Sequence, residues 1–331
     1  MIRRLAASAA GLTIVLIVAG GVVTNTDSGL ACPDWPTCYG SLVPRMTGNV
    51  AVEHTHRLIA TAVGLLTVAL VILTMRRAAV WMAGFSTLVL GGAIWAARVK
   101  HVSGELPVAG VTLVALGFAG CIWVIARSSE KLAPAALLLV MVQGLLGGLT
   151  VLYKLPTLVL VMHLGTSMLF MALLLAIAWG RPLQGGALLW LTTAAIYLQI
   201  LLGATVRHTG AGLVCTDLPY CRGAIWPANV HPMVHLHMAH RAFAIVVAAL
   251  VIWSSLRIAR NASGLVRVLA FAGPVLVVLQ IVLGILTILT FKDLVPLTAH
   301  LLAGALLLAD YVSLLALTRP APEPQLVQAL A

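Results

Sequence analysis

The hydrophobic positions of this chain fall in runs of roughly twenty residues separated by short polar segments, and a run of that length crosses the hydrocarbon core of a bilayer as a helix. Lipid offers no hydrogen-bond partner to an open strand, so the runs should be helical. We therefore predict an all-α polytopic membrane protein with ten spans. The predicted spans are 6–24, 54–75, 79–97, 107–126, 133–152, 157–179, 187–206, 233–256, 265–290 and 295–317.

Two parts of the chain repeat each other. The segment Gly29–Gly40 matches Gly212–Gly223 at seven of twelve positions, at an offset of 183 residues. Further along, Gln143–Thr150 matches Gln280–Thr287 at five of eight positions, at an offset of 137. Self-similarity of this kind indicates repeated structural units.

The fall in the offset indicates an insertion in the first half. The offset is 184 between His56 and His240 and 137 in the later block, so the first half holds 47 additional residues. Two apolar runs supply them, and without these runs each half has four spans. An even number of spans gives both halves the same orientation, which predicts two four-helix bundles related by a pseudo-twofold axis along the membrane normal. We place the halves at residues 1–180 and 181–331, and the inserted pair at about 79–126.

The distribution of charged residues predicts how the chain is oriented in the membrane. Only 9% of residues are charged and the net charge is +11, with the basic residues scattered through short loops, which argues against nucleic-acid binding. We assign the side with more basic residues, which holds both termini, to the cytoplasm of a cell-membrane protein, and the cysteine-bearing loops to the outside. The cytoplasmic side carries Arg3, Arg4, Arg76, Arg77, Arg127, Lys131, Arg181, Arg257, Arg260, Arg267 and Arg319, against nine basic residues outside.

The N-terminal segment has a second interpretation. Met1–Val23 is typical of a secretory signal, with Arg3 and Arg4 before an apolar stretch. A similar segment, Leu188–Val206, precedes the matching loop in the middle of the chain. We therefore predict that the first segment is retained as a helix.

Four histidines fall within or at the ends of predicted spans and pair under the repeat, His56 with His240 and His163 with His300. Ionisable side chains at membrane depth are costly and indicate function. Successive spans cross the membrane in opposite directions, and the histidine-bearing spans all start at the outer side. All four histidines, which lie near the starts of these spans, are therefore expected toward the outer side. A planar iron macrocycle needs one ligand on each face, and imidazoles on facing helices supply this. We interpret the histidines as two bis-histidine haem sites, and the alternative is hydrogen bonding between helices.

The residues beside these histidines differ between the halves. Arg57 and Arg241 each follow a histidine at the outer boundary, where a guanidinium can pair with a haem propionate or simply extend to the interface. Glu53 lies three positions before His56, on the same helix face, and its counterpart is His237. This asymmetry favours acid–base chemistry at the first site and plain cofactor binding at the second. The alternative for Glu53 is a solvated first-turn residue that faces the helix dipole.

Four of the five cysteines are paired by the repeat. Cys32 and Cys38 share one outer loop, and Cys215 and Cys221 share its counterpart. An oxidising outer side favours a disulfide in each loop, while redox-active thiols or a metal site remain alternatives. Cys121 lies alone in an inserted span and is expected to serve packing.

The remaining histidines carry weaker signals. The run from His231 through His235 and His237 to His240 has a spacing that could bind copper or zinc, but no thiolate or carboxylate completes the set. We therefore predict no further metal site. We place His54, His208, His231, His235 and His237 in or near outer loops.

As a set, these motifs resemble the haem A synthase family of membrane enzymes. The matching elements are Glu53-x-x-His56-Arg57, His163, His240-Arg241, His300 and the Cys32/Cys38 loop with its repeat. The resemblance covers nearly the whole chain apart from about 79–126, and the inserted pair is a departure because the family pattern has eight spans.

The resemblance implies that the C8 methyl of haem O is oxidised to a formyl group, giving haem A for terminal-oxidase biogenesis. It implies that His56 and His163 flank the iron of haem O and that Glu53 is the catalytic carboxylate. It also implies that His240 and His300 ligate a haem b cofactor. The expected partners are haem O synthase as haem donor, an unidentified electron partner and the lipid bilayer, and homo-oligomerisation is left open.

Two other functions remain as alternatives. A non-catalytic di-haem protein that passes electrons from quinol to a periplasmic acceptor would also use bis-histidine haem, but it needs neither Glu53 nor unequal halves. Repeated helical halves also occur in transporters, whose broken helices lie at the midplane. Here the unusual residues cluster at the outer ends instead.

Overall fold

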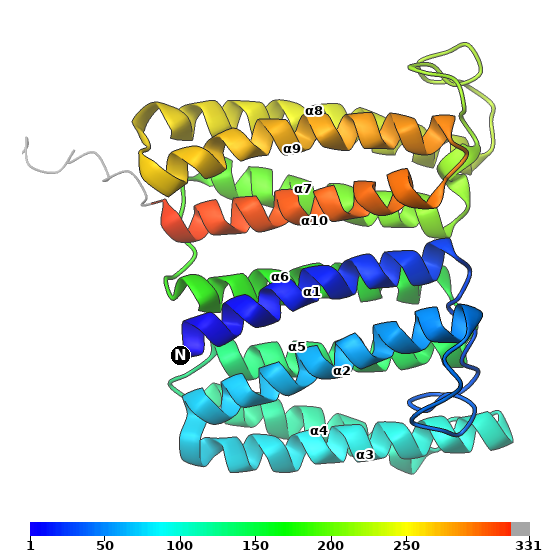
Figure 1. The fold of residues 1–331 in the computed structure, drawn as a ribbon, viewed down its shortest axis with the longest axis vertical. Helices are drawn as coiled ribbons and strands as arrows, with labels where there is room; N and C mark the ends of the chain where they lie inside the picture. Colours follow the sequence, from blue (N-terminus) through cyan, green and yellow to red (C-terminus); the bar gives the residue numbers. More distant parts are fainter. Residues whose placement is uncertain (319–331) are drawn as a thin grey trace, which may run out of the picture.

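The computed structural model describes residues 1–318, and within them the chain is helical, with the long helices lying side by side in two layers (Figure 1). The α-helices are α1 (Ile2–Asn25), α2 (Gly48–Met75), α3 (Ala79–Ser103), α4 (Val108–Arg127), α5 (Leu132–Leu152), α6 (Thr157–Trp179), α7 (Ala187–His208), α8 (Pro232–Asn261), α9 (Gly264–Leu289) and α10 (Leu294–Leu317), with short 3₁₀ helices η1 (Arg76–Ala78) and η2 (Ala211–Leu213).

These helices are long and apolar enough to cross a membrane. Nine stretches of the described chain meet that criterion, and the longest, Gly48–Ser103, contains both α2 and α3. Arg76, with φ of 50°, breaks that stretch at η1 and turns the chain back. The predicted all-α membrane fold with ten spans is therefore confirmed. The largest differences are six residues each: α3 ends at Ser103 and not at residue 97, and α2 begins at Gly48 and not at residue 54, because its first turn and a half lies in the polar outer segment.

Each half forms a closed ring of four helices. In the first ring α1 packs on α2 and α6, and α5 packs on the same two helices. In the second ring α7 packs on α8 and α10, and α9 packs on the same two helices. The helices α1, α2, α5 and α6 correspond to α7, α8, α9 and α10, in that order. Corresponding helices make the same contacts in both rings, as a pseudo-twofold relation requires.

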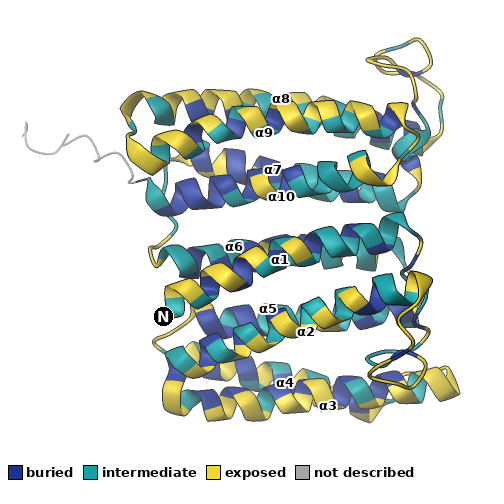
Figure 2. Cartoon of the chain, in the orientation of Figure 1, coloured by how far each residue is buried: buried dark blue, intermediate teal, exposed yellow. Residues whose placement is uncertain are grey.

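The two rings meet through α1, α6, α7 and α10. In its most apolar stretch, 72% of α10 is buried inside the protein, against at most 44% for any other described span. The helix α10 therefore lies at the centre of the molecule (Figure 2). Polar side chains also join the rings. The Arg207 guanidinium donates to Asn25 Oδ1 at 2.6 Å, and the Asn25 amide donates to Thr298 Oγ1 at 3.0 Å.

The pair α3 and α4 lies outside the first ring, at one edge of the molecule (Figure 1). It packs chiefly on α5, and the two helices approach each other closely through glycines. A Cβ at Gly117 would lie 2.8 Å from the carbonyl oxygen of Phe85 and 2.9 Å from the amide nitrogen of Val89. Only glycine allows the two backbones to come this near each other.

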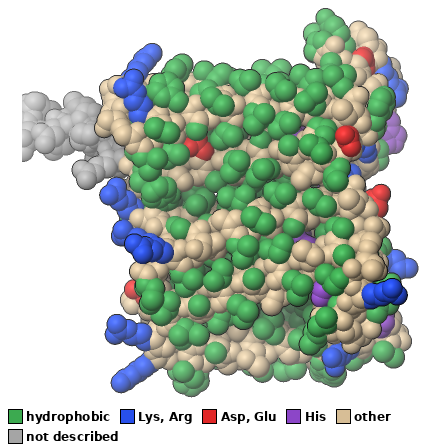
Figure 3. Space-filling model, viewed as in Figure 1, with side chains coloured by type: hydrophobic (Ala, Val, Ile, Leu, Met, Phe, Trp, Pro, Cys, Tyr) green, Lys and Arg blue, Asp and Glu red, His purple; other side chains and the backbone are tan. Residues whose placement is uncertain are grey.

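The surface matches a lipid environment. Hydrophobic side chains cover the middle of the face seen in Figure 3, and basic side chains gather at the two ends of the helices. Exposed apolar residues lie along the outer faces of the helices, while the inner faces are buried (Figure 2). The chain is a multi-pass membrane protein. Which end faces the cytoplasm stays a prediction, and Arg319, one of the residues counted for it, lies outside the described residues.

The α3–α4 packing can be tested with a cysteine. Ser86 Oγ lies 3.9 Å from the sulfur of the buried Cys121, so a cysteine at position 86 needs little movement to reach disulfide distance. We expect Ser86→Cys to form a disulfide with Cys121 on mild oxidation, detectable by peptide mass mapping without reduction. Thr87→Cys is the matched control, because the neighbouring residue is exposed and should not cross-link. Equal cross-linking of both variants would contradict this packing.

Candidate functional site

The four repeated histidines occupy equivalent places in four helices. His56 and His240 are the ninth residues of α2 and α8, and His163 and His300 are the seventh residues of α6 and α10. All four helices start at the end of the molecule that carries the two long loops (Figure 1). The histidines therefore lie toward that end, one pair in each ring.

The two histidines of each half come from opposite helices of one ring. His56 of α2 and His163 of α6 are separated by α1 and α5, and His240 of α8 and His300 of α10 are separated by α7 and α9. Each four-helix ring thus carries two imidazoles on different helices.

Each of these imidazoles lies against a glycine of the neighbouring helix. A Cβ added at any of the four glycines would meet the Cε1 atom of the histidine. The distances are 3.1 Å for Gly20 and His56, 3.4 Å for Gly147 and His163, 2.9 Å for Gly203 and His240, and 3.3 Å for Gly284 and His300. The glycines repeat at the same offsets, 183 and 137, as the motifs around them. The recurrence of these glycines at the repeat offsets is the sequence signal that could have identified them as contacts of the histidines.

Glutamine side chains fix the histidine-bearing helices. Gln143 donates to the carbonyl oxygen of His163 at 2.7 Å, and Gln280 donates to that of His300 at 2.8 Å. The His300 Nδ1 also lies 3.0 Å from the carbonyl oxygen of Gln280. Because that oxygen can only accept, Nδ1 carries the proton and Nε2 keeps a free lone pair, as a metal ligand requires.

One glutamine has no counterpart in the first ring. Gln199 of α7 donates to the carbonyl oxygen of His240 at 3.0 Å and lies 3.1 Å from its Nδ1. The equivalent position in α1 is Leu16. The second site therefore has a polar contact to its histidine that the first site lacks.

Glu53 is buried in α2, three residues before His56, where its carboxylate meets the first cysteine loop. Its side chain is 5% exposed, and its carboxylate accepts a hydrogen bond from the backbone N–H of Cys32 at 2.7 Å. The other oxygen pairs with Arg57 at 2.5 Å. Because α2 begins at Gly48, Glu53 lies beyond the first turn, so the alternative of a solvated first-turn residue is wrong.

Arg57 holds the backbone of the first cysteine loop. Its guanidinium donates to the carbonyl oxygens of Asp34 at 2.9 Å, Thr37 at 2.7 Å and, more distantly, Cys32 at 3.4 Å. Its side chain is 15% exposed, so it does not simply extend into the interface. A contact with a haem propionate stays a prediction.

Arg241 makes the equivalent contacts in the second half. It donates to the carbonyl oxygens of Cys215 at 2.5 Å, Asp217 at 3.0 Å and Tyr220 at 3.1 Å, which match Cys32, Asp34 and Thr37 at the offset of 183. In place of a carboxylate, its Nε meets the Nε2 of His237 at 3.2 Å. The two loops are thus bound in the same way, and the carboxylate is found only in the first half.

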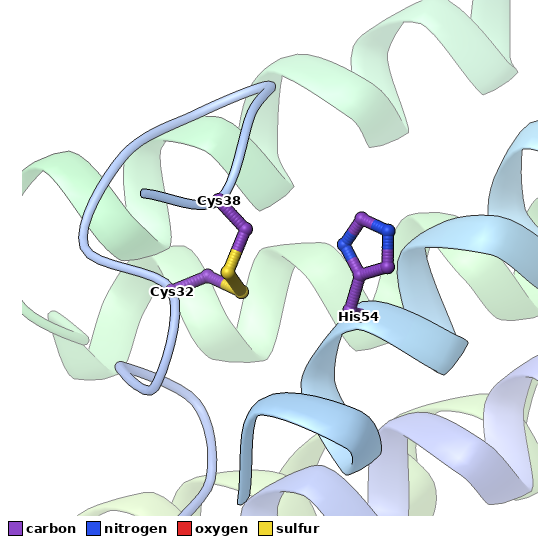
Figure 4. A group of neighbouring side chains, drawn as sticks. All are labelled: Cys32, Cys38 and His54. Carbon is purple, nitrogen blue, oxygen red and sulfur yellow. A yellow bond between two sulfur atoms is a disulfide. The ribbon is translucent and has the colours of Figure 1, made fainter. Parts of the chain in front are cut away.

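Both predicted disulfides, Cys32–Cys38 and Cys215–Cys221, are formed in the structure. His54 faces the first disulfide (Figure 4), and its ring and the two sulfurs lie within 4.8 Å of one another. The sulfurs are bonded to each other, which leaves no thiolate for a metal. The counterpart of His54 is Met238, which packs against the second disulfide.

The hydrogen bonds of an aspartate shape each loop. Burial raises the pKa of the Asp34 carboxyl, but hydrogen bonds from the Thr37 hydroxyl and the amides of Gly40 and Tyr39 outweigh this and leave the pKa below its ordinary value. The amide of Gly223 is the main cause of a lowered pKa at Asp217. Both carboxylates are therefore charged at neutral pH and hold their loops closed.

The other histidines have separate structural roles. His54 and His237 lie near the outer loops as expected, because His54 faces the loop disulfide and His237 contacts the loop-binding Arg241, but both are buried residues of α2 and α8 and do not belong to the loops themselves. His231 caps α8 by accepting from the amide of Met233 at 3.3 Å. His235 stacks on Trp226, with 5.3 Å between ring centroids. The run of histidines from His231 onward is thus spread over different surroundings.

Sequence reasoning missed one buried carboxylate. Asp310 in α10 is 6% exposed, and neither of its oxygens has a hydrogen-bond partner among the described residues. It lies ten residues beyond His300, about 15 Å along the helix axis. An acidic residue inside an apolar run was the signal that could have revealed it.

Comparison with known proteins shows to which family the chain belongs. The sequence pattern of the COX15-CtaA family of cytochrome oxidase assembly proteins matches residues 3–51 and 107–312, together about three quarters of the chain. The chain belongs to this family. The unmatched stretch 52–106 contains α3 and most of α2 and does not coincide with the predicted insertion at 79–126. We keep α3 and α4 as the predicted insertion, because α2 has a packing counterpart in α8.

Several relatives carry the name "Heme A synthase". That of Symbiobacterium thermophilum is 28% identical over 279 residues, covering 78% of this chain and 76% of the relative. That of Lysinibacillus sphaericus is 28% identical over 324 residues, covering 91% and 90%. That of Shewanella oneidensis is 27% identical over 341 residues, covering 91% and 92%. The likeness to these relatives therefore extends over most of both chains.

The residues of this family member fit a haem in each ring. Two imidazoles come from different helices, each packs against a glycine of the neighbouring helix, and His300 presents the free Nε2 that iron requires. His56 and His163 would hold one haem, and His240 and His300 the other.

The glycine contacts give a test of this arrangement. Gly203→Ala places a methyl group 2.9 Å from His240 Cε1 and should turn the imidazole away, and disturbing the support of a metal ligand costs roughly 10- to 100-fold in affinity. We expect the purified variant to retain less haem in the second half, measured by the haem-to-protein ratio and the absorption spectrum. Gly144→Ala is the control, because nothing lies within 4 Å of the added Cβ. Full haem retention in Gly203→Ala would contradict the assignment of His240.

Proposed function

We propose that this protein is a haem A synthase, which oxidises the C8 methyl group of haem O to a formyl group. The observation that carries the proposal is the buried carboxylate of Glu53, one turn before His56 in the first ring of helices. Membership in a family of cytochrome oxidase assembly proteins and the names of the relatives support it.

We assign the first ring to the substrate and the second to a resident cofactor. His56 and His163 would ligate haem O, and His240 and His300 would ligate haem b. Two contacts support this division. Glu53 stands where the second ring has His237, and Gln199, which fixes His240, stands where the first ring has Leu16. A permanent cofactor benefits from extra fixation of its ligand, while a substrate must come and go.

Glu53 is suited to accept protons during the oxidation. Conversion of a methyl to a formyl group replaces two hydrogens of the carbon with one oxygen atom and, with water as the source of that oxygen, releases four electrons and four protons. Bound haem would supply the redox chemistry. The Cys32 amide and the Arg57 guanidinium hold the Glu53 carboxylate in one orientation, and Glu53 precedes His56 by three residues on the same helix. A general base held this way contributes typically 10²- to 10⁴-fold to a rate.

We further propose a location and partners. The basic residues favour cytoplasmic termini and outer cysteine loops, and both histidine pairs then lie near the outer side of the cell membrane. Haem O is supplied by a haem O synthase, and an electron partner takes up the electrons.

The first experiment is chromatography of haems extracted from cells that express this chain together with a haem O-producing enzyme. Haem A, absent from cells lacking this chain, is the expected product. Persistent haem O, with the same haem type bound in both rings of the purified protein, would overturn the proposal. That outcome would favour the di-haem electron carrier.

Glu53 has its own test. Glu53→Gln keeps an oxygen for the Cys32 amide but removes the proton-accepting carboxylate, so formyl production should fall by about 10²-fold or more while bound haem is retained. The control is Glu105→Gln, which changes an exposed carboxylate in the loop between α3 and α4. Normal haem A formation in Glu53→Gln would remove Glu53 from the reaction.

A further inference from the structure

The contacts of the first cysteine loop join the disulfide, Arg57 and Glu53 into one unit. Arg57 donates to four carbonyl oxygens of the loop, those of Cys32, Asp34, Pro36 and Thr37, and to one oxygen of Glu53. The loop returns a backbone N–H, that of Cys32, to the other oxygen of Glu53. We propose that Arg57 is a positioning residue, which locks the disulfide loop so that the loop amide aims the Glu53 carboxylate.

The geometry of the guanidinium supports this role. Arginine presents five N–H donors in a rigid planar fork, so one side chain can bind several acceptors that diverge. Nη1 of Arg57 serves Asp34 and Thr37, and Nη2 serves Cys32 and Glu53. A lysine carries the same charge on a single atom and cannot span these acceptors. The arrangement therefore depends on the fork as well as on the charge.

The second half shows which contacts belong to the loop and which to the carboxylate. Arg241 binds three equivalent carbonyl oxygens although, among the described residues, it forms no ion pair with a carboxylate. Binding of the loop is therefore the shared role of the arginine. In the first half Glu53 is added to this shared arrangement, and the loop then has a second role, which is to orient the carboxylate.

The disulfide completes the unit. Cys32 supplies both the amide that binds Glu53 and one end of the Cys32–Cys38 bond, which closes the loop across a separation of six residues. Both cysteines are fully buried, while loop residues such as Tyr39 and Val43 are exposed. The cross-link and the arginine thus fix the buried base of a loop whose tip is open.

The first experiment follows the two loops independently of catalysis. The rate at which a phosphine reduces each disulfide is measured by alkylation and mass spectrometry in Arg57→Lys and in its matched variant Arg241→Lys. We expect Arg57→Lys to speed reduction of Cys32–Cys38 severalfold and leave Cys215–Cys221 at its rate in the unaltered protein, and Arg241→Lys to do the reverse. Unchanged reduction of Cys32–Cys38 in Arg57→Lys would overturn the role of Arg57 in the loop.

The second experiment concerns Glu53 and rests on the proposed function. In Arg57→Lys we expect kcat for haem A formation to fall, on the order of a hundredfold for a misplaced catalytic group, with KM for haem O unchanged. A raised KM with unchanged kcat would instead assign Arg57 to substrate binding, as the propionate prediction has it, and would overturn the positioning role. If the unaltered protein makes no haem A, the proposed function fails, while the reduction rates still decide whether Arg57 locks the loop.

Discussion

The contact between an imidazole and a glycine backbone sets the spacing of the helices on which both sites depend. Four such contacts join α1 to α2, α5 to α6, α7 to α8 and α9 to α10. A larger residue at any of these glycines would have to displace a histidine or separate two helices. In lipid, where hydrophobic burial does not drive helices together, close backbone approach of this kind is a main source of packing energy. The same four contacts therefore hold the rings together and place the four candidate ligands.

Within this symmetric frame, the differences between the halves are few and local. The histidines, glycines, disulfide loops and loop-binding arginines recur, while Glu53, His54 and Leu16 are replaced by His237, Met238 and Gln199. These replacements surround the first pair of ligands with a carboxylate and the second pair with an additional polar contact. A duplicated frame can thus give two sites different chemistry through a few side chains, without a change in backbone.

The parts of the structure that depend only on the residue types within one segment could be predicted from the sequence. The ten spans followed from the length of the apolar runs, and the pairing of His56 with His163 followed from the repeat and the alternation of the spans. The start of α2 did not follow, because Gly48–Ala51 lies outside the apolar run. The contacts of Arg57 could not be predicted either. They are made with backbone carbonyl oxygens. The positions of these oxygens depend on how the loop folds, and the side chains of the loop residues do not indicate them.

The glycine–histidine contacts lie between these two cases. Each glycine was visible at the repeat offset, yet its partner is set by how two helices face each other, which a single apolar run does not encode. Helices that are apolar on all sides show no periodic pattern that would identify the inner face. Only the polar residues mark a face, and in α1 the sequence near Gly20 has none that points at His56. A repeated glycine opposite a repeated histidine therefore carries information that hydropathy cannot supply.

The position of α3 and α4 explains how the core tolerates two more helices than the second half has. The pair leaves the first ring after α2 and returns at α5, and it packs on the outer side of α5, away from α1. A hairpin of two spans brings the chain back to the side of the membrane from which it left, so α5 and α6 keep their direction and His163 keeps its depth. The helices α3 and α4 approach each other closely at Gly117, so they pack mainly on each other. Because the pair needs no contact with α1 or α6 to form, it can be added at the lipid-facing edge without moving the ligands.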